Sequence, residues 1–177
     1  GINKYDFIKV HQKNVNNFIN KYNLKKNFLL SVGHFEKRKN FIMLIKAFKI
    51  LVNEGSINLK LIIIGNDSGY KKKIISLIKD LNLYNHVKIL SNLSDKEIRC
   101  AYFASKIFLF PSIYEGFGIP IIEAMVFKKP MVLSNIDVFK EITKNKMLYF
   151  NPNNEFSIAS KINDLLNSEK MQEEQIS

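Results

Sequence analysis

The sequence has 177 residues, of which 46% are hydrophobic, and this length fits one compact domain with a core of its own. Its 27 lysines and arginines exceed its 16 aspartates and glutamates. The resulting formal net charge of +11 favours anionic partners such as phosphates, acidic lipid surfaces or nucleic acid. A solvated, lysine-rich surface explains the same charge equally well. The single cysteine, Cys100, excludes an intrachain disulfide and favours a reducing compartment such as the cytoplasm.

The apolar runs are all much shorter than the roughly 18–20 residues needed to span a bilayer, so we expect no transmembrane segment. Residues 1–7 also lack the order of charged and then apolar residues that a signal peptide has. We interpret these residues as lying within a longer chain and not at its natural beginning.

Short apolar runs rich in β-branched residues alternate with longer amphipathic stretches along the sequence. In chain order, the pattern predicts a strand at 28–32, a helix at 41–53, a strand at 59–64, a helix at 70–81, a strand at 87–90, a helix from Ser94 through Ala104, a strand at 107–110, a helix at 119–127, a strand at 131–133, a helix at 138–143, a strand at 148–150 and a helix at 156–166. The spacing of Ser94 and Glu97 is that of a capping box. The polar tail, 167–177, is expected to fray or to dock on a missing partner, because it has little apolar surface.

This alternation of strands and helices is typical of βαβ units around a parallel sheet. The sequence has no internal repeat and no linker. It therefore predicts a single α/β domain over 1–177, with one Rossmann-like, doubly wound parallel sheet of about six strands. Ligands bind such sheets beyond the carboxyl ends of the strands, so functional residues are expected in the loops that follow strands.

The segment after the strand at 107–110 has the composition of an anion site. Gly116 and Gly118 allow a tight turn and a close approach of the backbone to a ligand, and Pro120 suits the first turn of a helix. The N-terminus of that helix offers free N–H donors and the positive end of the helix dipole, which favour a phosphate or diphosphate. Glu115 and Glu123 bracket the turn, and we expect both carboxylates to face a ligand lying across the helix end. In the plainer interpretation they only favour the helix start, and the glycines only make a turn.

The run from Glu115 to Glu123 resembles the Glu-x7-Glu motif of retaining glycosyltransferases with the two-domain architecture called GT-B, particularly glycosyltransferase family 4. The blocks 31–40, 61–65, 129–135 and 150–152 are similar to the same family in the same order. The resemblance implies that 1–177 is the donor-binding, C-terminal half of such an enzyme, and that an N-terminal acceptor domain is absent from this chain. It also implies transfer of a hexose to a glycan or lipid-linked acceptor in surface polysaccharide or glycoconjugate synthesis, without activity in the isolated domain.

The resemblance also gives roles to the residues of the motif. It implies that Glu115 is the catalytic residue and contacts hydroxyls of the donor sugar, and that Glu123 contacts the ribose of the nucleotide. The backbone N–H groups of Phe117, Gly118 and Ile119 are expected to hold the sugar and the diphosphate. Such preorganised donors stabilise the charge that the leaving diphosphate gains in the transition state.

Three further positions carry expected donor contacts. Lys39 matches the family lysine that reaches the diphosphate, and His34 stands where many members have an arginine paired with that lysine. Leu93 lies in the loop expected to seat the base. Lys37 and Arg38 are interpreted as ordinary surface charges. We expect no metal and no cofactor besides the nucleotide-sugar substrate.

Two other classes of function stay open. A non-catalytic module that binds a nucleotide or a partner would fit an isolated domain, and a nucleic-acid-binding domain would fit the charge. The aromatic residues fall on expected helix stripes and strands, which favours core positions and argues against a nucleic-acid partner. The dinucleotide fingerprint, the P-loop, the nucleophile elbow and metal-ligand spacing of the histidines and Cys100 are all missing.

The basic surface, in a family that acts on lipid-linked acceptors, also predicts peripheral contact with an anionic membrane. The expected location is the cytoplasm, with attachment to the cytoplasmic face of the membrane. The base and sugar of the donor, the acceptor and the oligomeric state stay undetermined.

Overall fold

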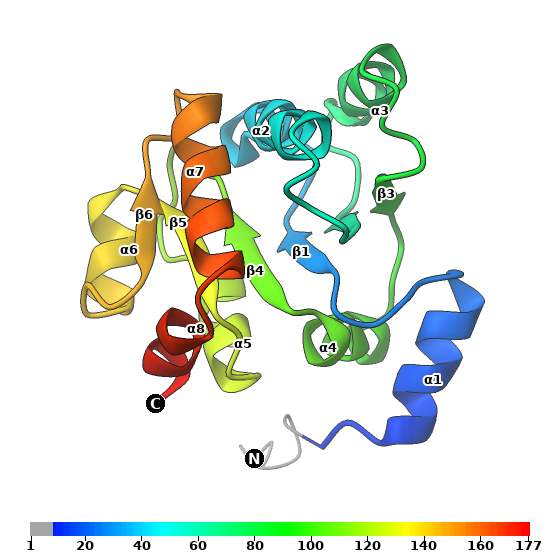
Figure 1. The fold of residues 1–177 in the computed structure, drawn as a ribbon. Coiled ribbons are helices and arrows are strands. Elements are labelled where there is room, and N and C mark those ends of the chain that lie inside the picture. Colours follow the sequence, from blue (N-terminus) through cyan, green and yellow to red (C-terminus); the bar gives the residue numbers. More distant parts are fainter. Residues whose placement is uncertain (1–8) are drawn as a thin grey trace.

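The computed structural model describes residues 9–177, and the interpretation given for residues 1–7 lies outside this range. Six parallel strands form one sheet in the order β3-β2-β1-β4-β5-β6 (Figure 1). The strands are β1 (Leu29–Val32), β2 (Leu61–Ile64), β3 (Val87–Leu90), β4 (Ile107–Phe110), β5 (Met131–Ser134) and β6 (Leu148–Phe150). The predicted fold class and all six predicted strands are confirmed, with ends that differ by at most two residues.

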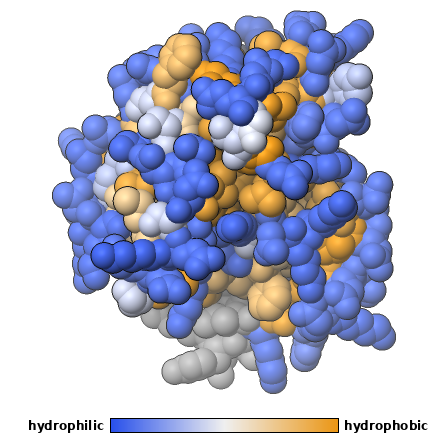
Figure 2. Space-filling view, in the orientation of Figure 1, coloured by the Kyte–Doolittle hydropathy of each residue, from blue (hydrophilic) through white to orange (hydrophobic). Residues whose placement is uncertain are grey.

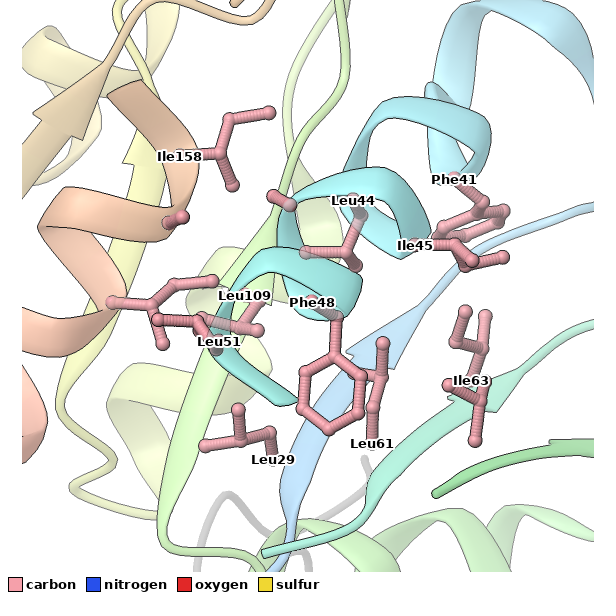
Figure 3. Close-up of a cluster of buried hydrophobic side chains, with 14 of the residues drawn as sticks. Leu29, Phe41, Leu44, Ile45, Phe48, Leu51, Leu61, Ile63, Leu109 and Ile158 are labelled. Atoms are coloured by element: carbon pink, nitrogen blue, oxygen red, sulfur yellow. The ribbon is translucent and has the colours of Figure 1, made fainter. Parts of the chain in front are cut away.

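Helices cover both faces of the sheet. They are α1 (Gln12–Lys21), α2 (Phe41–Asn53), α3 (Lys71–Asp80), α4 (Asp95–Ala104), α5 (Ile119–Val126), α6 (Asp137–Ile142), α7 (Glu155–Leu166) and α8 (Glu169–Ile176), with a short 3-10 turn, η1 (Lys37–Lys39). Side chains alternate along a strand, so each strand serves two cores. Leu29 belongs to a hydrophobic cluster with side chains of α2, α3 and α7, whereas Leu30 belongs to a second cluster with side chains of α1, α4, α5 and α6. Figure 3 shows the first core, where Phe48 of α2 lies beside Leu29 and Leu61.

The strand order sets the place of the functional site. From β1 the chain moves outward through β2 to β3, and it then returns to β4 on the other side of β1. The loops after β1 and β4 therefore diverge to opposite faces and leave a crevice between them.

Helix α1 was not predicted. Its buried face consists of only Val15 and Phe18, and the helix is otherwise polar. It packs against α4, where Lys21 pairs with Glu97 at 2.7 Å and the Tyr22 hydroxyl donates to the same carboxylate at 2.9 Å. The three-residue spacing of Val15 and Phe18 was the sequence signal that could have indicated it.

The expectation that the tail frays or needs a partner was wrong. Residues Glu169–Ile176 form α8, which begins at the capping residue Ser168. The helix buries no side chain of its own, but the Gln175 side chain accepts the Met131 N–H at 2.7 Å and Gln172 donates to the Leu165 carbonyl at 2.7 Å. Hydrogen bonds to the start of β5 and the end of α7 thus replace the apolar contacts that the tail lacks.

Most of the face seen in Figure 1 is hydrophilic, with hydrophobic side chains exposed between the polar ones (Figure 2). Within residues 9–177, none of the helices combines the length and apolar character needed to cross a membrane.

Candidate functional site

A cleft of about 530 Å³ lies at the carboxyl ends of β1 and β2, where the strand order reverses beside β4. Five segments contribute to it: the loops after β1, β2 and β3, the start of α4, and the turn that leads into α5. The lining residues are Val32, Gly33, His34, Arg38, Lys39, Ile64, Gly65, Asn66, Asn92, Leu93, Asp95, Ile98, Glu115, Phe117, Gly118, Ile119 and Pro120. All of the predicted site residues except Glu123 are among them.

The floor of the cleft depends on two glycines that follow β1 and β2. A Cβ on Gly65 would lie 1.8 Å from the carbonyl oxygen of Gly33. This oxygen belongs to the backbone and cannot avoid the clash by a change of rotamer. A Cβ on Gly33 would lie 3.1 Å from Cδ of Lys39. The absence of side chains at these positions therefore allows the two loops and the lysine stem to pack together.

Asn40 fixes the turn that delivers Lys39. Its backbone is left-handed, with φ of 60°, and its buried side-chain amide donates to the carbonyls of Pro111 at 3.0 Å and Pro152 at 2.8 Å. These bonds join the loop after β1 to the loops after β4 and β6. The buried Lys39 side chain consequently reaches Glu115, with Nζ 2.5 Å from Oε1 and 4.9 Å from the centre of the Phe110 ring.

The Glu115 side chain has three partners in the cleft. One carboxylate oxygen accepts from Lys39 and from the Ser112 hydroxyl at 2.9 Å, and the other pairs with the Arg38 guanidinium at 2.9 Å. Burial raises the pKa of Glu115, but the bonds from Lys39, Ser112 and Arg38 more than offset burial and hold this pKa below its ordinary value. The carboxylate is therefore ionised at neutral pH and carries its charge between two cations.

Arg38 belongs to the site, and its interpretation as an ordinary surface charge was wrong. Its guanidinium lines the cleft, bridges Glu115 and Glu36, and donates to the Tyr114 carbonyl at 3.3 Å. Lys37 is exposed, in agreement with the prediction. Three adjacent basic residues in one 3-10 turn point in different directions, and composition alone could not resolve which of them face the cleft.

The turn into α5 has the geometry expected of an anion site. Gly118 is buried and left-handed, with φ of 75°, and the helix begins at Ile119 with Pro120 in its first turn. The first N–H groups of a helix have no partner within it. Ile119 carries the first of these N–H groups, and Phe117 and Gly118 directly precede the helix; all three residues line the cleft. The positive end of the helix dipole thus lies at the cleft, beside Lys39 and Arg38.

The sequence suggested that Glu123 and Glu115 face the same cleft, but Glu123 does not line it. It faces an adjoining recess of about 190 Å³, where its carboxylate accepts a 2.9 Å hydrogen bond from the buried Tyr102 hydroxyl. Asp95 and Ile98 line both hollows and form the border between them. Burial raises the pKa of Glu123, the bond from Tyr102 lowers it and repulsion from Asp95 raises it, so that the net shift is upward.

The remaining predicted contacts lie on the rim. His34 is exposed on the loop after β1, and Leu93 is half-buried on the loop after β3. Asn92, beside Leu93, is left-handed with φ of 58°, and its N–H donates to the Asn66 side chain at 2.9 Å. Within the described part of the chain, no three His, Cys, Asp or Glu side chains converge as metal ligands would.

The profile of a protein family described as Glycosyl transferases group 1 matches residues 12–177. The chain belongs to this family. It is 36% identical over 164 residues to the O-antigen chain mannosyltransferase RfbU of Salmonella typhimurium, a match that covers 93% of this chain and 42% of the relative. It is 30% identical over 156 residues to O-antigen chain mannosyltransferase B of Escherichia coli, covering 88% of this chain and 41% of the relative. The chain thus spans about two fifths of these relatives.

Solved structures agree with this family and its GT-B architecture. A glycosyltransferase from Rickettsia africae superposes with a TM-score of 0.84 at 25% identity, over 97% of this chain and 47% of that one. The C-terminal domain of a glycosyl transferase group 1 family protein, LpcC from Francisella tularensis, superposes with a TM-score of 0.79 at 20% identity, over 99% and 92% of the two chains. The resemblance to the C-terminal domain of a GT-B glycosyltransferase is confirmed.

Proposed function

We propose that this member of the glycosyl transferases group 1 family binds the nucleotide-diphospho-sugar donor of a retaining, family 4 glycosyltransferase. The reaction would transfer a hexose to a glycan or lipid-linked acceptor in surface polysaccharide or glycoconjugate synthesis. The observation that carries the proposal is the convergence of a helix N-terminus, Lys39 and the Glu115 carboxylate in one cleft at the point where the strand order reverses.

Each part of the donor has a suitable counterpart in the cleft. The start of α5 and Lys39 offer positive charge to the diphosphate, and Glu115 offers carboxylate oxygens to the sugar hydroxyls. The rim at Leu93 offers a half-buried apolar contact to the base, and Glu123 offers an acceptor to the ribose from the neighbouring recess. A donor that fills both hollows would pass over Asp95 and Ile98.

The same arrangement supports cleavage of the donor. When the bond between sugar and diphosphate breaks, negative charge grows on the leaving diphosphate, next to the helix N-terminus and Lys39. Donors that are already in place stabilise this charge without reorganising. We assign no general base and expect no metal or cofactor to be needed.

Transfer also requires a place for the acceptor. The mannosyltransferase relatives are more than twice as long as their match to this chain, and we propose that an N-terminal domain binds the acceptor. The chain by itself would then bind the donor without transferring sugar. The names of these relatives make mannose the first hexose to test.

Calorimetric titration of the chain with UDP-, GDP- and ADP-sugars tests the donor site. We expect one nucleotide to bind, and failure of all three would refute the proposal. If the full-length protein binds a donor but turns over no acceptor, the chain is a nucleotide-binding module and not part of an enzyme.

Substitution of the two glutamates separates their roles. Glu123→Ala in the full-length enzyme is expected to weaken donor binding, whereas Glu115→Ala is expected mainly to slow transfer. The measurement is donor affinity and turnover for each variant. Wild-type values in both would contradict the assigned roles.

A further inference from the structure

The cleft contains a charge arrangement that the assigned roles do not explain. Glu115 is almost completely buried, with 8% of its side chain exposed, and each of its carboxylate oxygens faces a different cation. Lys39 is equally buried, whereas 40% of the Arg38 side chain remains exposed. Arg38 is therefore the cation of this pair whose side chain is more accessible to a ligand.

The position of Arg38 relative to Lys39 is the decisive feature. Both cations contact one carboxylate, so their charged groups lie within the span of a single small anion. Both also line the cleft that the start of α5 enters. A guanidinium offers several N–H donors in a fixed plane, which suits phosphate oxygens better than an ammonium does.

His34 is a weaker partner for a diphosphate. It is exposed on the rim, and its side chain makes no hydrogen bond or ion pair with any of residues 9–177. A histidine also lacks the permanent charge of an arginine. No group among the described residues holds the imidazole toward the helix N-terminus in the way that Glu115, Glu36 and the Tyr114 carbonyl hold Arg38.

We propose that Arg38, and not His34, is the second cation that binds the donor diphosphate together with Lys39. In the unliganded chain the Glu115 carboxylate holds both cations in place. On binding, Arg38 and Lys39 turn part of their donors to the diphosphate, and Glu115 is released toward the sugar hydroxyls. This inference rests on the proposed donor site and adds a residue to it.

The test uses whichever of UDP, GDP or ADP binds the wild-type chain, because a nucleoside diphosphate has no sugar for Glu115 to contact. Arg38→Met is expected to weaken this binding about 10-fold or more, since a charge-assisted hydrogen bond is lost. Arg38→Lys should fall between wild type and Arg38→Met. Lys37→Met, which removes an exposed charge from the same turn, should change the affinity less than about 2-fold. His34→Ala should cost less than Arg38→Met.

A double-mutant cycle separates contact with the diphosphate from an effect through Glu115. Glu115→Gln frees both cations and should tighten binding of the nucleoside diphosphate. If Arg38 touches the diphosphate, Arg38→Met weakens binding in this background too. If Arg38 only positions Glu115, the loss disappears there, and the inference is overturned.

The remaining outcomes are also distinct. A wild-type chain that binds none of the three diphosphates refutes the donor site itself and the role of Arg38 with it. A wild-type chain that binds one, together with an Arg38→Met variant of equal affinity and unchanged thermal melting, refutes the role of Arg38 alone.

Discussion

Gly65 shows how one residue can determine the shape of the cleft. We expect Gly65→Ala to destabilise the chain by roughly 3 kcal/mol, because the new methyl group would meet the Gly33 carbonyl and force two strands apart. Urea unfolding measures the loss, and nucleotide titration should show weaker binding. Gly116→Ala is the matched control for stability, since a Cβ there meets nothing within 4 Å and the backbone is not left-handed. Equal stability of both variants would show that the floor is not tightly packed.

Glu123 is expected to lower the stability of the folded, unliganded chain at neutral pH. Its folded pKa lies above the ordinary 4.5, so the folded state loses stability relative to the unfolded state as the pH rises from about 4.5 through that raised pKa. Glu123→Gln removes this loss of stability, and the glutamine side chain can still accept the hydrogen bond from Tyr102. The variant should therefore melt higher than wild type at pH 7, with a gain that shrinks toward pH 4, while its donor affinity falls. A lower melting temperature at pH 7 would contradict the raised pKa.

The sequence predicted the positions of some residues of the cleft correctly and those of others wrongly. Lys39, Glu115 and the glycine turn belong to local motifs, and each lies in the cleft as predicted. Arg38 and Glu123 were misplaced because their directions depend on contacts from elsewhere in the chain. Glu115 orients the first, and Tyr102 orients the second.

Among the elements, α4 shows how one side chain can serve two helices. The predicted capping box is present, since the Ser94 hydroxyl accepts the Glu97 N–H at 3.3 Å and the Glu97 carboxylate accepts the Ser94 N–H at 2.9 Å. The same carboxylate accepts hydrogen bonds from Lys21, the last residue of α1, and from Tyr22, which follows it. The hydrogen bond from Lys21 is the largest of the effects that lower the pKa of Glu97 to about 2.

Glu97→Gln should therefore weaken the attachment of α1 while leaving a capping acceptor in place. We expect a loss of about 1 kcal/mol at pH 7, a value reduced for solvent screening of a partly exposed pair. The lowered pKa places this contribution above pH 4.5, and it should vanish as the pH falls from 4.5 to about 2. Urea unfolding at pH 7 and pH 3 provides the measurement. A difference between the two proteins that does not shrink on acidification would count against the ion pair.

Helices could be predicted where their buried apolar residues recur at regular spacing. Helix α2 was predicted to the residue, because its apolar positions recur with helical spacing against the sheet. Helices α1 and α8 were missed because α1 buries only two of its side chains and α8 buries none. Hydrogen bonds and ion pairs to distant segments hold them, and such partners leave no periodic signal in a single sequence.

On the scale of the whole molecule, the two edges of the sheet differ in character. The carboxyl edge holds the proposed donor cleft. At the amino ends of β1, β2 and β3 lies a second hollow, of about 290 Å³, with an apolar floor that includes Phe28 and Ile62. Lys25, Lys26, Lys60 and His86 line it, and no carboxylate does. Because this hollow lies at the opposite edge, an acidic surface could bind there and leave the cleft open to the donor.

The proposed peripheral contact with an anionic membrane can be tested at that edge. We expect the chain to float with vesicles that contain acidic phospholipid, and not with neutral ones, because several lysines near a surface each add roughly 1 kcal/mol of attraction. Replacing Lys25, Lys26 and Lys60 by glutamine should abolish most of this flotation. Replacing Lys37, Lys72 and Lys73 by glutamine removes the same amount of charge from the region beyond the carboxyl ends of the strands. This variant should still float with the acidic vesicles. If both triple variants lose flotation equally, the attraction comes from net charge and not from this edge; if wild type does not float at all, the membrane contact is refuted.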